Sequence, residues 1–162
     1  MYVQTLFVLL VVMENKTSKY CNCLYHSVNA LSRVLTKMAD EEFAVTGLTS
    51  SYALLLMSVN EKPGIQPKEI SKEMQLTPST VTRLIEKLEL KGLVERRNSG
   101  RCTMVYPTQD GIEKQKIIQD AWASLHNRYS ELLGKEKTNL LTSEVASSMQ
   151  LLGENPKCHV IN

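Results

Sequence analysis

The residues whose types and spacing could bind a polyanion lie in positions 77–101, where hydroxyl and basic side chains alternate with apolar ones. Apolar residues recur at spacings of three and four from Val81 to Leu88, which predicts one buried stripe along a helix. Ser79, Arg83 and Glu86 then fall on the opposite, solvent face. Hydroxyls and the free N–H groups of a helix start can bind phosphate, and an arginine can bind a guanine edge. The pattern is typical of a helix that enters the DNA major groove.

The candidates for DNA contact lie on this helix or in the basic segment that follows it. They are Thr77, Ser79, Thr80, Thr82, Arg83, Lys87, Arg96, Arg97, Asn98 and Arg101. Residues 76–101 carry six basic side chains against three acidic ones, a net charge of +3 in a chain whose net charge is +2. A local excess of positive charge favours a polyanionic partner. A solvated helix and a charged hairpin without a ligand are the alternative, which the ordered combination of features disfavours.

Other reactive side chains carry weaker signals. Cys21, Cys23 and His26 suggest a metal site, but on a helix the two cysteines point about 200° apart and cannot share one ion with the histidine. The four cysteines show neither paired CxxC spacing nor a disulfide framework. No nucleophile elbow, phosphate-binding loop or dinucleotide fingerprint is present. We expect no metal, no cofactor and no enzymatic activity.

The elements that must position the basic residues begin with two short helices. Thr49 is a candidate N-cap for the helix that precedes them. Pro67 marks the start of a short helix that runs to about Gln75. Thr77-Pro78 repeats the start signal for the helix that carries the exposed arginine, which runs to about Lys91.

A β-hairpin is predicted after Gly92, where the hydrophobic period changes from helical to two. Residues 94–97 and 102–106 flank the turn cluster Asn98-Ser99-Gly100. Two short helices followed by a basic hairpin form a winged helix-turn-helix lobe, which we assign to residues 49–108. The fold class is therefore mainly α with a small β-hairpin.

Amphipathic helices flank this lobe on both sides. The first has an apolar stripe of Leu24, Val28, Leu31 and Leu35. After the lobe, Thr108 caps a long helix that reaches about Leu133. Its expected buried face comprises Ile118, Trp122, Leu125, Tyr129 and Leu132. Gly134 breaks the pattern, and a last helix carries Leu141, Val145, Met149 and Leu152.

The two ends of the chain differ in character from the rest. Residues 1–12 are apolar but lack a basic region and a small-residue cleavage site, and they are too short to span a bilayer. We interpret Met13 as the natural start and residues 1–12 as an extension that is not native, with an apolar arm for dimer packing as the alternative. Residues 154–162 are expected to form a flexible tail.

The sequence resembles the MarR family of bacterial regulators. The matching motifs are Glu69-Ile70-Ser71, the run from Leu76 to Ile85, Lys91-Gly92-Leu93-Val94-Glu95-Arg96-Arg97 and Pro107-Thr108-Gln109-Asp110-Gly111. The resemblance implies an obligate homodimer, with residues 13–48 and 109–153 as interlocking dimerisation helices. It also implies two winged lobes on a pseudo-palindromic operator in double-stranded DNA. The short hairpin tip departs from the family, because it lacks the aspartate that commonly supports the wing arginine.

The resemblance also points to a region that responds to a signal. It implies a small-molecule pocket between the first helices and the long helix, which Tyr52 and Trp122 could line. Cys21 followed by Tyr25 is similar to the thiol-based branch that senses organic hydroperoxides, although Leu35 stands where that branch has a second tyrosine. A small aromatic effector, an oxidant, or a Cys21 that only fills space all stay open.

The combined pattern predicts a cytoplasmic, sequence-specific DNA-binding transcriptional regulator with no membrane association. A repressor released by an effector or by thiol oxidation is the expected mode of action. Two alternatives belong to other classes: a protein–protein interaction module that has kept the fold and lost DNA binding, and a thiol-dependent enzyme.

Overall fold

A computed structural model describes residues 19, 20, 22–100 and 102–153 of the chain. The elements follow one another as α2 (Leu24–Phe43), η1 (Ala44–Thr46), α3 (Ser50–Glu61), α4 (Pro67–Glu73), α5 (Pro78–Leu90), β1 (Val94–Ser99), β2 (Cys102–Pro107), α6 (Gln109–Glu113), α7 (Gln115–Leu133) and α8 (Lys135–Gly153). The expected fold class, mainly α with one antiparallel hairpin, is confirmed.

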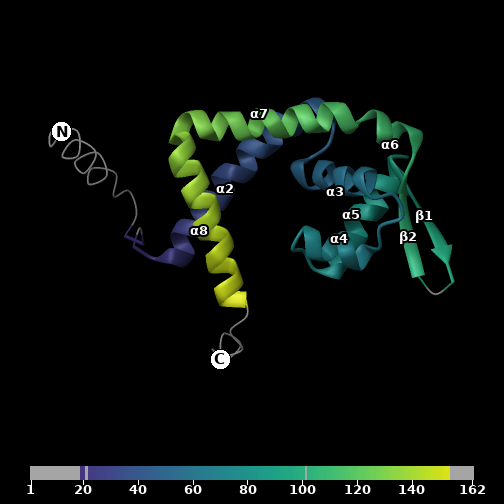
Figure 1. Cartoon of the computed structure of the whole chain (residues 1–162), viewed down its shortest axis with the longest axis horizontal. Coiled ribbons are helices and arrows are strands. Elements are labelled where there is room, and N and C mark those ends of the chain that lie inside the picture. Colours follow the sequence, from purple (N-terminus) through teal and green to yellow (C-terminus); the bar gives the residue numbers. More distant parts are fainter. Residues whose placement is uncertain (1–18, 21, 101, 154–162) are drawn as a thin grey trace.

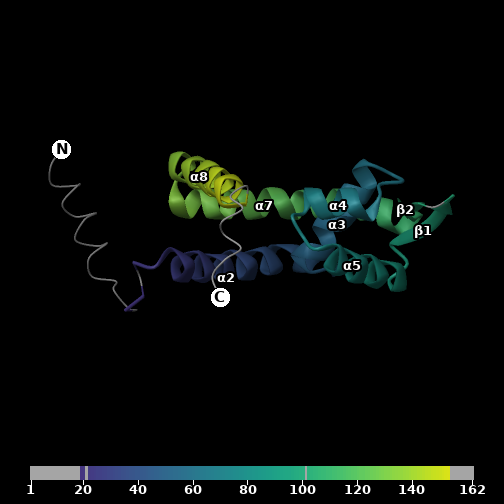
Figure 2. The ribbon, with the colours of Figure 1, turned by 90° about the horizontal axis from the view of Figure 1, so that it is seen from below.

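The elements separate into a lobe and a set of long helices (Figure 1). Helices α3, α4 and α5 and the hairpin gather at one end, and α7 runs from this lobe to a corner where α8 turns away. The view from below shows α2 running lengthwise beside α7 (Figure 2). Because α7 belongs to both parts, its orientation determines how the lobe is held relative to α8.

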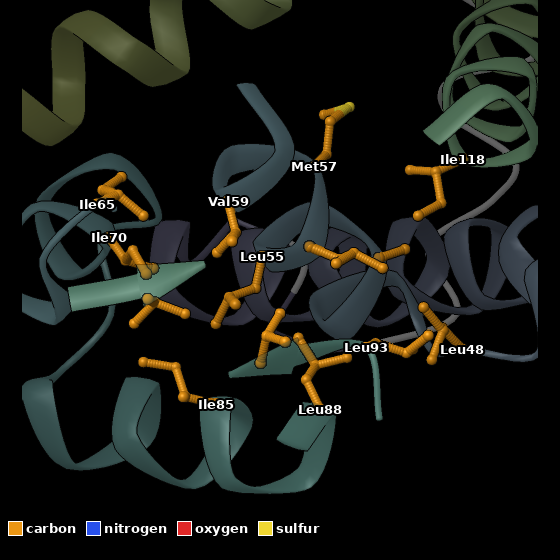
Figure 3. Packing of buried hydrophobic residues seen from close by; sticks show 14 of the residues in the cluster. Leu48, Leu55, Met57, Val59, Ile65, Ile70, Ile85, Leu88, Leu93 and Ile118 are labelled. Carbon is orange, nitrogen blue, oxygen red and sulfur yellow. The ribbon is translucent and has the colours of Figure 1, made fainter. Parts of the chain in front are cut away.

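The hydrophobic core lies inside the lobe, between α3, α5 and the hairpin (Figure 3). Leu55 and Val59 of α3 face Ile85 and Leu88 of α5, and all four side chains are almost completely buried. Truncating a buried leucine or isoleucine to alanine costs about 2–5 kcal/mol, so this core is the main support of α5. The apolar stripe predicted for α5 is confirmed.

All three predicted threonines stand at helix starts, but only Thr77 and Thr108 cap through their side chains, and Thr49 at the start of α3 forms no side-chain cap hydrogen bond. Thr77 Oγ1 accepts a hydrogen bond from the backbone N–H of Thr80, at 3.3 Å. Thr108 Oγ1 accepts from Gly111 N at 3.1 Å and donates to the carbonyl of Gly92 at 2.6 Å. Each cap satisfies one of the free donors at a helix start. Thr108 also ties the start of α6 to the turn before the hairpin.

Two expectations about the region after the hairpin are wrong. The single helix expected from Thr108 to Leu133 is two helices, α6 and α7, which meet at Lys114. Leu132 and Trp122, both expected on the buried face, are 73% and 45% exposed. Leu132 lies in the far half of α7, which extends beyond the lobe and has fewer elements to pack against. Trp122 borders a groove between α2, α3 and α7.

Helices α2, α7 and α8 leave many large apolar side chains in contact with solvent. Leu24 is 70% exposed, and Val145 and Met149 of α8 are about half exposed. These positions lie on stripes with helical spacing, and such stripes normally face another element.

No single helix in the described part of the chain is long and apolar enough to cross a membrane. The bent pair Leu24–Thr46 and Ser50–Glu61 reaches the required length and composition only when its two pieces are combined. Residues 1–18, Cys21, Arg101 and 154–162 lie outside the described residues. The structure therefore does not test the expectations for the extension 1–12 and the tail 154–162.

Candidate nucleic-acid interface

Helix α5 presents the predicted contact residues to solvent because its other face is fixed in the core. Val81, Ile85 and Leu88 are buried, and the candidates on the opposite side are exposed. These exposed candidates are Thr77, Ser79, Thr80, Thr82, Arg83 and Lys87. A tight turn precedes the helix, with Gln75 at φ 52° and Leu76 N bonded to Ser71 O at 3.1 Å. The structure therefore brings the predicted helical residues together on one face.

The hydroxyl groups at the start of α5 form a local network. Thr77 Oγ1 lies 2.8 Å from Thr80 Oγ1 and 3.1 Å from Ser79 Oγ. Thr82 Oγ1 donates to the carbonyl of Pro78 at 2.9 Å. A phosphate oxygen accepts hydrogen bonds, so Thr82 must redirect its proton before it can bind one.

Arg83 and Lys87 are the exposed cations on this face of α5. Neither forms an ion pair with any described residue. Their charge is therefore available to an external anion, and the planar guanidinium of Arg83 can donate two parallel hydrogen bonds to a base edge. Arg83 is the strongest candidate for a base contact.

The hairpin pairs Val94 with Pro107 at its base and Ser99 with Cys102 at its tip. Asn98 and Ser99 thus belong to the strand, and the expectation that they form the turn is wrong. Gly100, at φ 61°, supplies the left-handed conformation that a tight hairpin turn requires. Arg101, which follows it, lies outside the described residues.

The two described arginines of the hairpin have different surroundings. Arg96 Nη2 lies 2.6 Å from Glu89 Oε2 of α5, and this contact raises the pKa of the Arg96 guanidinium above its ordinary value. Arg97 pairs with Glu95 and lies 4.5 Å above the ring of Tyr106. Sequence reasoning missed both pairs. The spacing of two between Glu95 and Arg97 was a visible signal, because such residues share one face of a strand.

Comparison with known proteins identifies the family. A model of the MarR family matches residues 46–101. The HTH-type transcriptional regulator YwoH of Bacillus subtilis is 35% identical over 97 residues, which cover 59% of this chain and 71% of YwoH. The chain belongs to the MarR family.

One further relative and one protein of similar fold have named functions. The transcriptional repressor MprA of Escherichia coli K12 is 32% identical to this MarR-family chain over 92 residues, 54% of this chain and 52% of MprA. The repressor CouR, known from Rhodococcus jostii RHA1, has been solved on a 23-mer DNA duplex, with a TM-score of 0.72 and 21% identity over 82% of this chain and 96% of CouR. Membership of a family of transcriptional regulators confirms that the chain is not an enzyme.

The residues predicted to sense a signal in this MarR-family protein are not all brought together. Trp122, 45% exposed, lines a groove of about 360 Å³ between α2, α3 and α7. Tyr52 does not line this groove but packs against the core, and Tyr25 is 78% exposed near the start of α2. Cys21 lies outside the described residues.

Two structural features that involve Tyr129 were not assigned from the sequence. Tyr129, expected only as a core residue, lines the groove together with Leu125. The spacing of Trp122, Leu125 and Tyr129 by three and four residues was the available signal, since it puts them on one helix face. Tyr129 also lines a second, mostly apolar hollow of about 430 Å³ between α2, α7 and α8.

Proposed function

We propose that this MarR-family protein is a cytoplasmic, sequence-specific DNA-binding transcriptional repressor that acts as a homodimer. The observation that carries the proposal is the exposed face of α5, where Arg83 and Lys87 have no ion-pair partner among the described residues. The hairpin beside it adds Arg97 and Asn98, both exposed. Repression is favoured over activation because MprA and CouR are described as transcriptional repressors.

In this proposal the predicted domains have separate roles. Residues 49–108 bind DNA, and residues 13–48 and 109–153 dimerise through the exposed apolar faces of α2, α7 and α8. A symmetric dimer would place two copies of α5 in successive major grooves of a pseudo-palindromic operator. The half-sites should then be centred roughly 34–36 Å apart, one turn of the duplex.

A gel-shift assay against the DNA upstream of the protein's own gene, beside a randomised duplex library, tests the proposal. We expect a shifted complex that contains two protein chains and selects a two-fold sequence. Failure to bind any duplex at low salt would contradict the proposal and favour the alternative of an interaction module that has lost DNA binding. That alternative also predicts that Arg83→Ala changes nothing in partner binding.

We further propose that a small aromatic or amphipathic effector releases the DNA by binding the groove beside Trp122. The groove touches α2, α3 and α7, so a ligand there would contact both the lobe and the long helices. CouR, solved with p-coumaroyl-CoA, is a relative in fold whose structure holds an aromatic ligand. Trp122→Ala should weaken the response to an effector while leaving DNA binding in its absence unchanged.

Thiol oxidation at Cys21 is the competing mode of release. Tyr25, expected to hold the thiolate, is exposed near the start of α2. Hydroperoxide titrated into the protein–DNA complex, with wild type beside Cys21→Ser, separates the two modes. Release of DNA from wild type but not from Cys21→Ser would support release by oxidation of Cys21. Equal responses of the two proteins would mean that Cys21 only fills space.

A further inference from the structure

The side chain of Glu89 connects helix α5 to the first strand of the hairpin at two points. Its Oε1 accepts a hydrogen bond from the backbone N–H of Arg96 at 3.0 Å, and its Oε2 lies 2.6 Å from Nη2 of the same arginine. The Glu89 and Arg96 side chains are 28% and 37% exposed, so the pair is partly shielded from water. One carboxylate thus binds both the main chain and the side chain of Arg96.

The opposite strand is attached to the lobe at the same level. Val105 is the register partner of Arg96. The N–H of Val105 donates to the carbonyl of Ile65 at 3.0 Å, and its carbonyl accepts from Gly64 N at 2.8 Å. Beyond this level three pairs, Arg97–Met104, Asn98–Thr103 and Ser99–Cys102, extend away from these attachments. The direction of the outer hairpin is therefore set at Arg96 and Val105.

An isolated surface ion pair contributes little to stability, because water and salt screen it. The Glu89 carboxylate differs because it also binds a backbone N–H group, which fixes the strand and not only a flexible side chain. In the arrangement observed, the Arg96 guanidinium is already engaged by an anion of the protein. A phosphate would have to displace Glu89 before it could bind Arg96.

We propose that Glu89 is a positioning residue which, through Arg96, holds the hairpin at the angle to α5 that DNA binding requires. Arg96 then acts within the protein. The hairpin residues left to face the DNA are Asn98 and Arg97, whose side chain is 63% exposed and would have to exchange Glu95 for a phosphate. The proposal rests on the proposed function of DNA binding.

The test can separate two effects of Glu89, because the loss of its charge and the loss of its positioning role change the affinity for DNA in opposite directions. Removing a carboxylate near a polyanion raises affinity by electrostatics alone. If Glu89 positions the hairpin, Glu89→Ala should instead lower affinity for the operator roughly three- to tenfold, the equivalent of losing one or two ordinary hydrogen bonds. Glu86→Ala is the control for charge alone: Glu86 lies on the same helix and helps to raise the pKa of Arg96 through its charge, but it is exposed and forms no ion pair with a described residue. It should leave affinity equal or raise it.

A second measurement does not depend on DNA. In Glu89→Ala the amide of Arg96 should exchange with solvent faster, while the amides of the α3–α5 core stay protected. Glu89→Gln, whose amide oxygen can still accept from the Arg96 N–H, should keep more of the affinity and of the amide protection than Glu89→Ala.

Two results would overturn the positioning role. One is a rise in affinity for Glu89→Ala that equals the rise for Glu86→Ala, and the other is a wild-type exchange rate at Arg96. Wild-type protein that binds no duplex would contradict the proposed function instead, and the exchange rate would still decide whether Glu89 holds the strand.

Discussion

The ammonium group of Lys114 donates a hydrogen bond to the backbone carbonyl of Thr46, at 2.9 Å, across 68 positions of sequence. Thr46 is itself buried, and its hydroxyl donates to Phe43 O at 2.6 Å and accepts from Leu48 N at 3.1 Å. Lys114 stands between α6 and α7. The corner where α2 leads into the lobe is therefore tied to the point where α7 leaves it.

Lys114→Met should lower the free energy of unfolding by about 1–2 kcal/mol, because it keeps the apolar stem and removes the charged donor to a buried corner. Lys116→Met is the control, since Lys116 is exposed and, among the described residues, forms an ion pair only with Asp120 on its own helix. Chemical denaturation of both variants measures the difference. Equal stabilities would mean that the Lys114 contact contributes nothing.

Arg83→Ala should weaken operator binding by about 1–3 kcal/mol and relax the preference at one base pair of each half-site. Arg97→Ala should lower affinity for all duplexes and flatten its salt dependence, because a lost phosphate contact releases fewer counterions. Affinities for operator and random duplex, measured at several salt concentrations, separate these roles. An equal loss on both duplexes for Arg83→Ala would rule it out as a base reader.

Gly111→Ala should destabilise the fold severely. A Cβ atom at this position would lie 2.1 Å from the backbone carbonyl oxygen of Leu93, and two main-chain segments would have to separate. We expect a loss of roughly 3 kcal/mol or more, in the range of the large steric effects. Gly153→Ala, where no atom lies within 4 Å of the added Cβ, is the control in a thermal melt. A melting temperature as high for Gly111→Ala as for the control would contradict this contact.

The stability of the protein should fall in acid partly because of Glu69. Lys62 Nζ and the N–H of Gln66 donate to its carboxylate, and these bonds lower the pKa of Glu69 below the ordinary 4.5. A lowered folded-state pKa gives stability that is present above the unfolded pKa and is lost as pH falls through the folded one. Denaturation measures the free energy of unfolding at pH 6 and at pH 3. The loss of this free energy between the two pH values should be smaller for Glu69→Gln than for wild type. The same difference in both proteins would count against this account.

Val145→Asp should dissociate the proposed dimer, because it places a charge on the exposed apolar face of α8. Val45→Asp is the control, since Val45 is also exposed but lies on the η1 turn. Sedimentation should show the monomer mass for the first variant and the dimer mass for the second. A monomeric wild type would contradict the dimer itself.

Local signals in the sequence predicted much of the fold. A threonine cap depends only on residues within one helical turn, so Thr77 and Thr108 could be assigned from sequence and are confirmed. The burial of Val81, Ile85 and Leu88 follows from their spacing and is confirmed too. Once those three residues were expected in the core, the exposed side of α5 could be assigned as well.

What the sequence could not predict depends on contacts between distant elements. The apolar period continues through Lys114, so nothing local marks the division into α6 and α7, where Asn60 of α3 binds Gly111 O and Gln115 Oε1. The partner of Arg96 could not be assigned, because the turn at Gly92 decides whether Glu89 reaches it. Tyr52 and Trp122 were expected to share a pocket, but their helices present them to different surroundings.

The length of α7 gives its junction with α6 a mechanical consequence. Nineteen residues at about 1.5 Å each make a rod about 28 Å long, held near one end by Lys114. A tilt of about 5° at that end displaces the other by about 2–3 Å, by the geometry of a helix of this length. In a dimer joined through the far ends of two such helices, a small side-chain adjustment beside Lys114 would tilt each lobe relative to its helix. The distance between the two lobes would then change by several times the size of the adjustment.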